Sequence, residues 1–331
     1  MNTTGLYEEL AKKVGMAHSA IVPDLWRMIC SEEEARIVNA MPGTAEGLAE
    51  TFGKPVAEME AILQELFHRG VAFDSIKEGR RHYRMPRHII QFHDATILWP
   101  EAPPALLELW AKFTTEEYPS LPALVTQAGL PSFFRVLPVN EGIAAKGEIL
   151  PYEDAAQILE NAASLAVTQC TCRYVMKKCN RLLEACIQLN RGADYAIKRG
   201  TGRRIDVAEG KEILKKARAA GLVHMTENRA GIGNVICNCC DCCCIGIPFA
   251  KNPATRGVIA TSRYQAAVDA RSCTGCGLCI EVCPVDAISE DGAGAVNVNP
   301  AVCIGCGLCA FECPVSALSL QQIHPASFIP A

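Results

Sequence analysis

The sequence lacks a long apolar segment. No uninterrupted apolar run approaches the ~20 residues that a helix needs to cross a bilayer, although 50% of the 331 residues are hydrophobic. The stretch from Met1 to Val14 is polar with a helical pattern and has no apolar core of the signal-peptide kind. We therefore expect the nineteen cysteines to reside in a reducing cytoplasm, where thiols bind metals and disulfides are rare.

The sequence also lacks the signatures that would assign substrate chemistry. We find no paired carboxylates, nucleophile constellation, flavin fingerprint or nucleotide-binding loop. The glycines at Gly200 and Gly202 are not accompanied by the strand and Lys-Ser/Thr signature of a phosphate loop. An electron carrier or an electron-transfer subunit therefore fits the sequence better than an enzyme with its own substrate.

Basic residues are missing from the last part of the chain. Residues 272–331 contain no Lys or Arg, but they do contain Glu281, Asp286, Glu290, Asp291 and Glu312. Such an acidic surface predicts a redox partner protein with a basic docking face. The acidic surface could instead dock on the basic segment 190–230 of the same chain, which has ten Lys or Arg and five acids. The other interpretations of that segment are a solvated surface and a binding site for an anionic ligand.

What the chain does contain, near its C-terminal end, is a duplicated cysteine pattern. Cys-x-x-Cys-x-x-Cys-x-x-x-Cys-Pro begins at Cys273 and recurs from Cys303, with glycines at equivalent positions. In this spacing the fourth cysteine ligates the cluster of the other repeat. The predicted ligands are Cys273, Cys276, Cys279 and Cys313 for one 4Fe-4S cluster, and Cys303, Cys306, Cys309 and Cys283 for the second. Zinc knuckles or disulfides would not require this repeat.

The stretch from Ala267 to Ile323 resembles the bacterial two-cluster ferredoxin domain and keeps its whole cysteine pattern. That resemblance implies two short hairpins, two helices and a role in electron transfer.

A second group of ten cysteines lies upstream. Its members are Cys170, Cys172, Cys179, Cys186, Cys237, Cys239, Cys240, Cys242, Cys243 and Cys244. Cys172, Cys179 and Cys186 are seven residues apart and would share one face of a continuous helix. In an extended run, Cys237, Cys239 and Cys243 would face one way and the remaining three the other.

The spacing leaves the nature of this upstream group open. Ten thiols suffice for one or two further iron-sulfur clusters, for one cluster of unusual composition, or for zinc, and a buried cysteine stripe is the alternative without metal. Together with the C-terminal repeat, Cys170-Thr-Cys172-Arg173 and the run at 237–244 resemble multi-domain iron-sulfur proteins of anaerobes. This resemblance does not indicate a substrate or a reaction.

The N-terminal part has a different pattern. A capping-box start at Ser31, two further helices ending at Arg69, and alternating segments around Glu78-Gly79 give the order helix, helix, helix, hairpin. This order resembles a winged helix over Ser31–His88. Because the expected recognition helix carries Glu58, Glu60 and Glu65, protein docking is favoured over DNA binding, although basic residues in the wing keep DNA possible.

We therefore predict an α+β multidomain protein with four parts. These are a winged-helix-like domain (1–90), a proline-rich connecting segment (91–150), a mainly helical cysteine-rich domain (151–262) and a two-cluster ferredoxin domain (263–331).

The leading functional hypothesis is electron transfer through the two clusters to a partner oxidoreductase or to a further centre in the same chain. The alternatives are an iron-sulfur reductase with an open-coordination cluster bound by the cysteines of residues 170–244, and a redox-sensing iron-sulfur transcription regulator. A homo-oligomer is compatible with all three hypotheses.

Overall fold

The computed structural model describes residues 5–144 and 149–331. The chain forms two compact units, Met1–Tyr118 and Pro119–Ala331. Their boundary falls inside the proline-rich segment expected to be a connection, and residues 145–148 of that segment lie outside the described residues.

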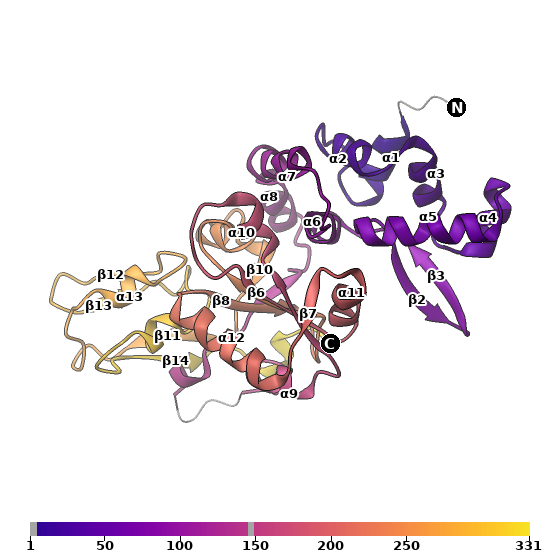
Figure 1. Ribbon diagram of the computed structural model, residues 1–331. Helices are drawn as coiled ribbons and strands as arrows, with labels where there is room; N and C mark the ends of the chain where they lie inside the picture. Colours follow the sequence, from indigo (N-terminus) through magenta and orange to yellow (C-terminus); the bar gives the residue numbers. More distant parts are fainter. Residues whose placement is uncertain (1–4, 145–148) are drawn as a thin grey trace. The chain divides into compact units, whose positions relative to one another are not determined.

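Unit 1 is helical with one small sheet (Figure 1). Its elements are α1 (Leu6–Lys13), α2 (Val22–Ile29), α3 (Glu32–Ala40), β1 (Gly43–Thr44), α4 (Ala45–Phe52), α5 (Val56–Arg69), β2 (Phe73–Lys77), β3 (Arg80–Arg84), α6 (Ile89–Ile97) and α7 (Pro104–Glu116). The three strands are antiparallel in the order β1-β3-β2.

Local sequence explains the ends of these helices. The capping box predicted at Ser31 is confirmed, because Ser31 and Glu34 exchange side-chain and backbone hydrogen bonds at the start of α3. Gly70, with φ of 87°, ends α5 in the left-handed conformation that glycine adopts readily.

Trp26 stacks on Phe92 with ring centroids 4.1 Å apart, and both are fully buried in the core of this unit.

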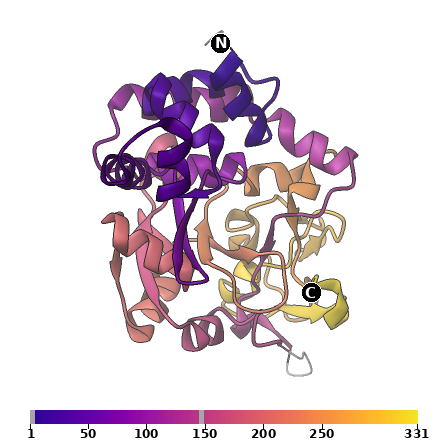
Figure 2. The same ribbon diagram turned by 90° about the vertical axis from the view of Figure 1, so that its right-hand side faces the viewer.

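Unit 2 is built around a mixed sheet of seven strands, in the order β10-β4-β8-β9-β6-β5-β7 (Figure 1 and Figure 2). The strands are β4 (Phe134–Val136), β5 (Leu165–Gln169), β6 (Glu184–Leu189), β7 (Gly202–Arg204), β8 (Val223–Glu227), β9 (Val235–Cys239) and β10 (Ile259–Ala260). The helices are α8 (Ser120–Gln127), α9 (Ala155–Asn161), α10 (Thr171–Met176), α11 (Arg191–Arg199) and α12 (Val207–Ala219), with short 3-10 turns at Asn140–Gly142, Ile247–Lys251 and Arg256–Val258. Leu159 of α9 and Leu214 of α12 pack with Leu165 and Val167 of β5 in one buried cluster.

This sheet corrects the sequence interpretation of residues 151–262. The expectation of a mainly helical region missed six strands of the sheet, β5 to β10. These strands are only two to six residues long, and three of them end at or next to cysteines or glycines, so their period-two pattern is too short to stand out.

The C-terminal part of unit 2 comes after the seven-stranded sheet in the sequence. It contains β11 (Tyr264–Val268), α13 (Leu278–Glu281), β12 (Ile288–Glu290), β13 (Val296–Val298), α14 (Leu308–Phe311), β14 (Leu318–Gln322) and a 3-10 turn at Ala326–Phe328. The two helices implied by the resemblance are present. Of the two expected short hairpins, β12 and β13 form one. The other is absent from the described residues, because β11 pairs antiparallel with β14, from the far end of this part of the chain.

Candidate metal centres

Glycines fix the two C-terminal cysteine loops. Gly275, Gly277, Gly305 and Gly307 all have positive φ between 65° and 81°. At Gly305 a Cβ atom would overlap the carbonyl oxygen of Tyr264 and Oγ of Ser262, so only glycine allows this approach. Each loop then leads directly into a short helix, α13 or α14.

The eight cysteines of the two loops line two separate cavities. Cys273, Cys276, Cys279 and Cys313 line the first, and Cys283, Cys303, Cys306 and Cys309 line the second. Each cavity thus combines three cysteines of one repeat with the fourth cysteine of the other. This is the grouping that the cross-ligation pattern predicts, while the ligand assignment itself stays a prediction.

The chemistry of these thiols fits an iron-sulfur cluster. Burial raises the pKa of Cys306 to about 12, and further thiols at Cys283 and Cys303 act in the same direction. A metal cation removes that penalty, because coordinating thiols bind in their deprotonated form. Backbone amides also point at the sulfurs: Ala287 N donates to Cys283 Sγ and Ala317 N to Cys313 Sγ, each at 3.2 Å.

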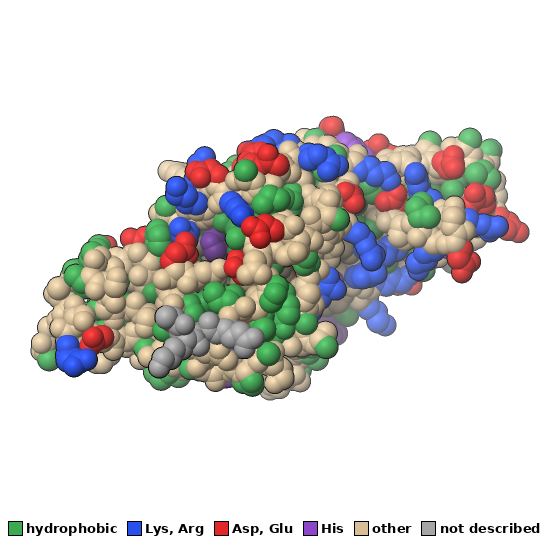
Figure 3. Space-filling view, turned by 90° about the horizontal axis from the view of Figure 1, so that it is seen from below, with side chains coloured by type: hydrophobic (Ala, Val, Ile, Leu, Met, Phe, Trp, Pro, Cys, Tyr) green, Lys and Arg blue, Asp and Glu red, His purple; other side chains and the backbone are tan. Residues whose placement is uncertain are grey.

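The two cavities differ in exposure. Cys276 of the first cavity is exposed, and the apolar side chains of Leu278 and Val315, which line the same cavity, are 42% and 43% exposed. Cys306 and Cys309 of the second cavity are buried. On the face drawn in Figure 3, charged side chains are few on the left, where Figure 1 draws β12, β13 and α13 of this part of unit 2.

Comparison with known families agrees with this geometry. Residues 266–320 match the family model of the 4Fe-4S dicluster domain. The matched stretch, called the dicluster domain below, is ferredoxin-like and indicates iron-sulfur electron transfer. A comparison of the whole chain with curated proteins found no match.

Six upstream cysteines form a connected group beside the sheet, called the six-cysteine group below. β6 and β9 are antiparallel with Ile187 opposite Ile236, which places Cys186 opposite Cys237 on one face of the sheet. Cys239 lies two residues further along β9, on the same face. Pairwise thiol contacts then link the members in the order Cys172, Cys170, Cys186, Cys237, Cys239 and Cys244.

The other four upstream cysteines are separate and compact. Cys179, Cys240, Cys242 and Cys243, called the four-cysteine group below, have sulfur atoms that all lie within 4.8 Å of one another. Cys179 follows α10, and the other three occupy the turn after β9. Among residues 5–144 and 149–331, no other three cysteine, histidine or acidic ligand atoms gather this closely.

Two of the expectations for these cysteines are wrong. Cys172, Cys179 and Cys186 do not share a helix face, because α10 ends at Met176, Lys177 adopts a left-handed conformation and Cys186 belongs to β6. The alternation expected over 237–244 stops at Cys239, where β9 ends and a turn begins. As a result Cys243 joins Cys240 and Cys242 instead of Cys237 and Cys239.

Arg173, the residue after Cys172 in the upstream cysteine pattern, is a functional candidate whose role the sequence alone does not indicate. Its side chain is buried, with Nη1 donating to the carbonyl oxygen of Asn238 at 2.8 Å and Nε to that of Leu182 at 3.0 Å. Burial would lower the pKa of Arg173, but the nearby thiols of Cys170, Cys240 and Cys186 raise it. Arg173 therefore lies between the two upstream groups, and its position directly after Cys172 was the available signal.

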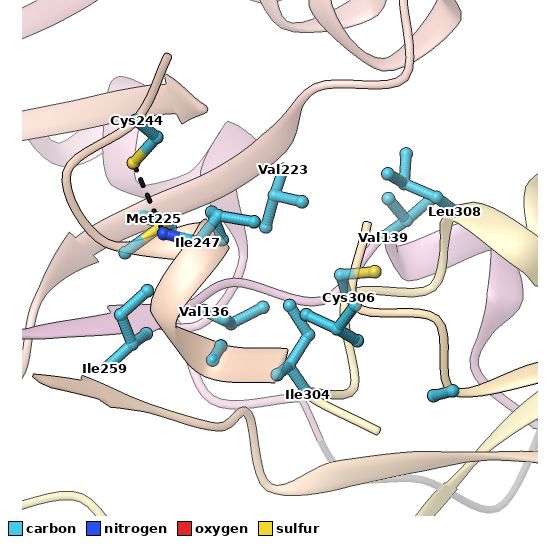
Figure 4. Close-up of a cluster of buried hydrophobic side chains, with 13 residues drawn as sticks. Val136, Val139, Val223, Met225, Cys244, Ile247, Ile259, Ile304, Cys306 and Leu308 are labelled. Atoms are coloured by element: carbon cyan, nitrogen blue, oxygen red, sulfur yellow. Dashed lines mark hydrogen bonds between the residues drawn. The ribbon is translucent and has the colours of Figure 1, made fainter. Parts of the chain in front are cut away.

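A buried apolar cluster connects the six-cysteine group to the dicluster domain. Cys244 and Cys306 belong to this one cluster, together with Val136, Val139, Met225 and Ile247 (Figure 4). Cys237, Cys239, Cys283 and Cys303 pack against it. Cys244 Sγ accepts hydrogen bonds from Gly246 N at 3.3 Å and Ile247 N at 3.5 Å, which holds this sulfur at the edge of the cluster.

The helices give no sign of a bilayer span. Across the two described ranges, none has both the length and the apolar character needed to traverse a membrane.

Proposed function

We propose that this protein carries electrons from an external donor through the two clusters of the dicluster domain to an iron-sulfur centre held by the six-cysteine group. The observation that carries the proposal is that Cys244 and Cys306 lie in one buried apolar cluster. When bound, iron-sulfur clusters supply one-electron redox chemistry at potentials set by burial and by hydrogen bonds to sulfur. The chain's own residues determine which site faces the donor and which lies deep in the fold.

The proposed entry point is the first cavity. Cys276 is exposed there, and the partly exposed Leu278 and Val315 offer apolar surface beside it for a partner. Glu281 and Glu312 are next to the cysteine loops, which favours a donor with a basic face around an apolar centre.

The proposed destination is the six-cysteine group. Arg173 offsets the negative charge that thiolates bring into a buried site, and the Cys172 and Cys186 thiols, together with Arg173, hold the pKa of Cys170 well below its usual range. Six thiols exceed what one cubane cluster requires, so the group suits a cluster with more than the usual four protein ligands. We place the protein in the reducing cytoplasm of an anaerobic cell, acting as a carrier or subunit of an oxidoreductase.

For unit 1 we propose a winged-helix module that docks a protein. Its support is the order of α3, β1, α4, α5 and the β2-β3 hairpin, with the strands ordered β1-β3-β2. Lys54 and Arg69, the basic residues at the ends of α5, pair with Glu58 and Glu65, so the helix presents little free positive charge to a nucleic acid.

Reduction kinetics test the electron route. We would purify the protein anaerobically with its clusters in place and add a reduced ferredoxin-type donor. The reduction of each centre would then be followed by rapid-freeze electron paramagnetic resonance. In Cys303→Ala, we expect the first cluster to be reduced normally and reduction of the six-cysteine centre to slow at least about tenfold, because the intermediate site is lost. Cys30→Ala, at a buried cysteine of unit 1, is the matched control and should behave as the wild type.

Two results would reject the proposed route. One is unchanged reduction of the six-cysteine centre in Cys303→Ala, which would show that electrons bypass the dicluster domain. The other is an iron content of only about eight per chain, which would leave the six-cysteine group without a cluster.

A further inference from the structure

The four-cysteine group has spacings that distinguish a single metal ion from a cluster. Cys179 Sγ lies 3.9 Å from Cys243 Sγ, and Cys242 Sγ lies 3.8 Å from Cys243 Sγ. Zinc binds thiolates at about 2.3 Å in a tetrahedron, and the edge of such a tetrahedron is about 3.8 Å long. These two separations match the edge of such a tetrahedron, and all four sulfur atoms lie within 4.8 Å of one another, as ligands of one ion must.

The dicluster domain provides an internal comparison. A 4Fe-4S cluster fills the space between its thiolates, so their sulfurs must stand farther apart than those around a single ion. Within the described residues, the eight dicluster cysteines form no group of three with all sulfur atoms inside 4.8 Å, and neither do the six upstream ones. The four-cysteine group is too compact to enclose a cubane.

The surroundings of the group support a closed ionic site over a packed cluster of neutral thiols. Four thiolates and one divalent cation carry a net charge of −2, and two arginines lie beside them. The buried Arg173 guanidinium lies near the Cys240 thiol and interacts with it electrostatically. Arg181 pairs with Asp241, at 2.7 Å, and interacts with Cys240 and Cys242 from the half-exposed side. An apolar thiol cluster would gain nothing from these cations.

The local backbone is also arranged as a metal-binding turn. Cys243 N donates to Cys240 Sγ at 3.4 Å, closing the turn that brings Cys242 and Cys243 toward Cys179. Met176, Leu182 and Leu222 pack around the group and limit access of water, as in a site without an open coordination position.

We propose that Cys179, Cys240, Cys242 and Cys243 bind one zinc ion in a closed, structural tetrahedral site. Zinc is preferred over ferrous iron because thiolate and imidazole sites generally bind Zn²⁺ more tightly than Fe²⁺. The ion joins the loop after α10 to the turn after β9. This site is independent of the proposed electron route.

Metal analysis of variants tests the site. In Cys179→Ala we expect zinc to fall from about one per chain to near zero, with iron and acid-labile sulfide unchanged. Cys186→Ala, in the six-cysteine group, is the matched control and should lose iron while keeping zinc. Loss of iron and sulfide together in Cys179→Ala would overturn the proposal, as would loss of a single iron without sulfide.

A measurement on the unaltered protein covers the case in which Cys179→Ala does not fold. Zinc-edge X-ray absorption of the anaerobically purified wild type should show four sulfur neighbours at about 2.3 Å. Absence of stoichiometric zinc, or a shell containing nitrogen or oxygen, would overturn the closed four-thiolate site. Either result leaves the kinetic test of electron transfer unaffected.

Discussion

At the scale of single residues, Arg173 is the side chain whose charge bears most directly on the upstream cysteines. It is 3% exposed and interacts with thiols of both groups. A buried positive charge beside an anionic centre favours the reduced, more negative state. We therefore expect Arg173→Gln to make the reduction potential of the six-cysteine centre more negative, measured by potentiometric titration.

Arg173→Lys and Arg181→Gln provide the comparison for that shift. Lysine keeps the charge but cannot make the two separate bonds to the Leu182 and Asn238 carbonyls, so an intermediate potential is expected. Arg181 is 36% exposed and pairs with Asp241, so its loss should move the potential less. An unchanged potential in Arg173→Gln would show that the charge of Arg173 does not affect the reduction potential of the six-cysteine centre.

His224 is a second residue with a measurable consequence, in this case for pH dependence. Burial lowers the pKa of His224 from its ordinary 6.5 to about 4, and the Asn238 side chain only partly opposes this. Between these values the unfolded chain binds a proton that the folded chain does not, so stability falls as the pH falls below 6.5. From pH 7.5 to 5.5 this group should cost about 1 kcal/mol of folding free energy.

His224→Asn isolates that contribution. The asparagine amide can replace Nδ1 toward Asn238 without titrating. We expect the variant to lose less thermal stability than the wild type between pH 7.5 and 5.5. Because both proteins carry the same metal sites, the difference between their unfolding midpoints removes the effect of acid on the clusters. Parallel pH profiles would show that His224 does not remain neutral in the fold.

At the scale of secondary-structure elements, the cysteine loops depend on particular glycines to different degrees. A Cβ at Gly305 would overlap backbone and side-chain atoms of Tyr264 and Ser262, whereas nothing lies within 4 Å of a Cβ at Gly277. Both have positive φ, which alone costs about 1–2 kcal/mol for alanine. Gly305→Ala should therefore lose iron at the second cavity, and Gly277→Ala should keep a full complement, as measured by iron and sulfide analysis. Equal iron contents in the two variants would contradict this.

The same scale explains what the sequence could and could not predict. The dicluster loops were predictable because every cavity combines cysteines from two neighbouring, nearly identical segments, and the helix ends at Ser31 and Gly70 follow from local capping. The partition of the upstream cysteines was not, because Cys179 meets Cys243 across 64 residues. The expected helix ends after Met176 because Lys177 adopts a left-handed backbone conformation. Lysine rarely adopts this conformation, so its presence at position 177 does not predict a helix end.

At the scale of the whole of unit 2, one buried ion pair joins the residue just before β11 to the segment before α9. Arg263 and Glu153 are each 1% exposed, and three hydrogen bonds of 2.7–3.0 Å join them. Arg263 also donates to the carbonyl oxygen of His324, near the end of the chain. Removing one member of such a pair leaves an uncompensated buried charge, which costs about 3–5 kcal/mol.

Glu153→Gln should therefore destabilise unit 2 strongly and release the dicluster domain early during unfolding. We expect a lower denaturation midpoint. We also expect the visible absorption of the dicluster domain to be lost first, and the fold around the four-cysteine group to open later, as measured by zinc release. Glu160→Gln, which breaks the exposed pair with Lys211, is the matched control and should cost less than about 1 kcal/mol. The double variant Glu153→Gln, Arg263→Met should recover part of the loss, because it removes the stranded charge. If the double variant is no more stable than Glu153→Gln, the pair acts through its shape and not through the charge of Arg263.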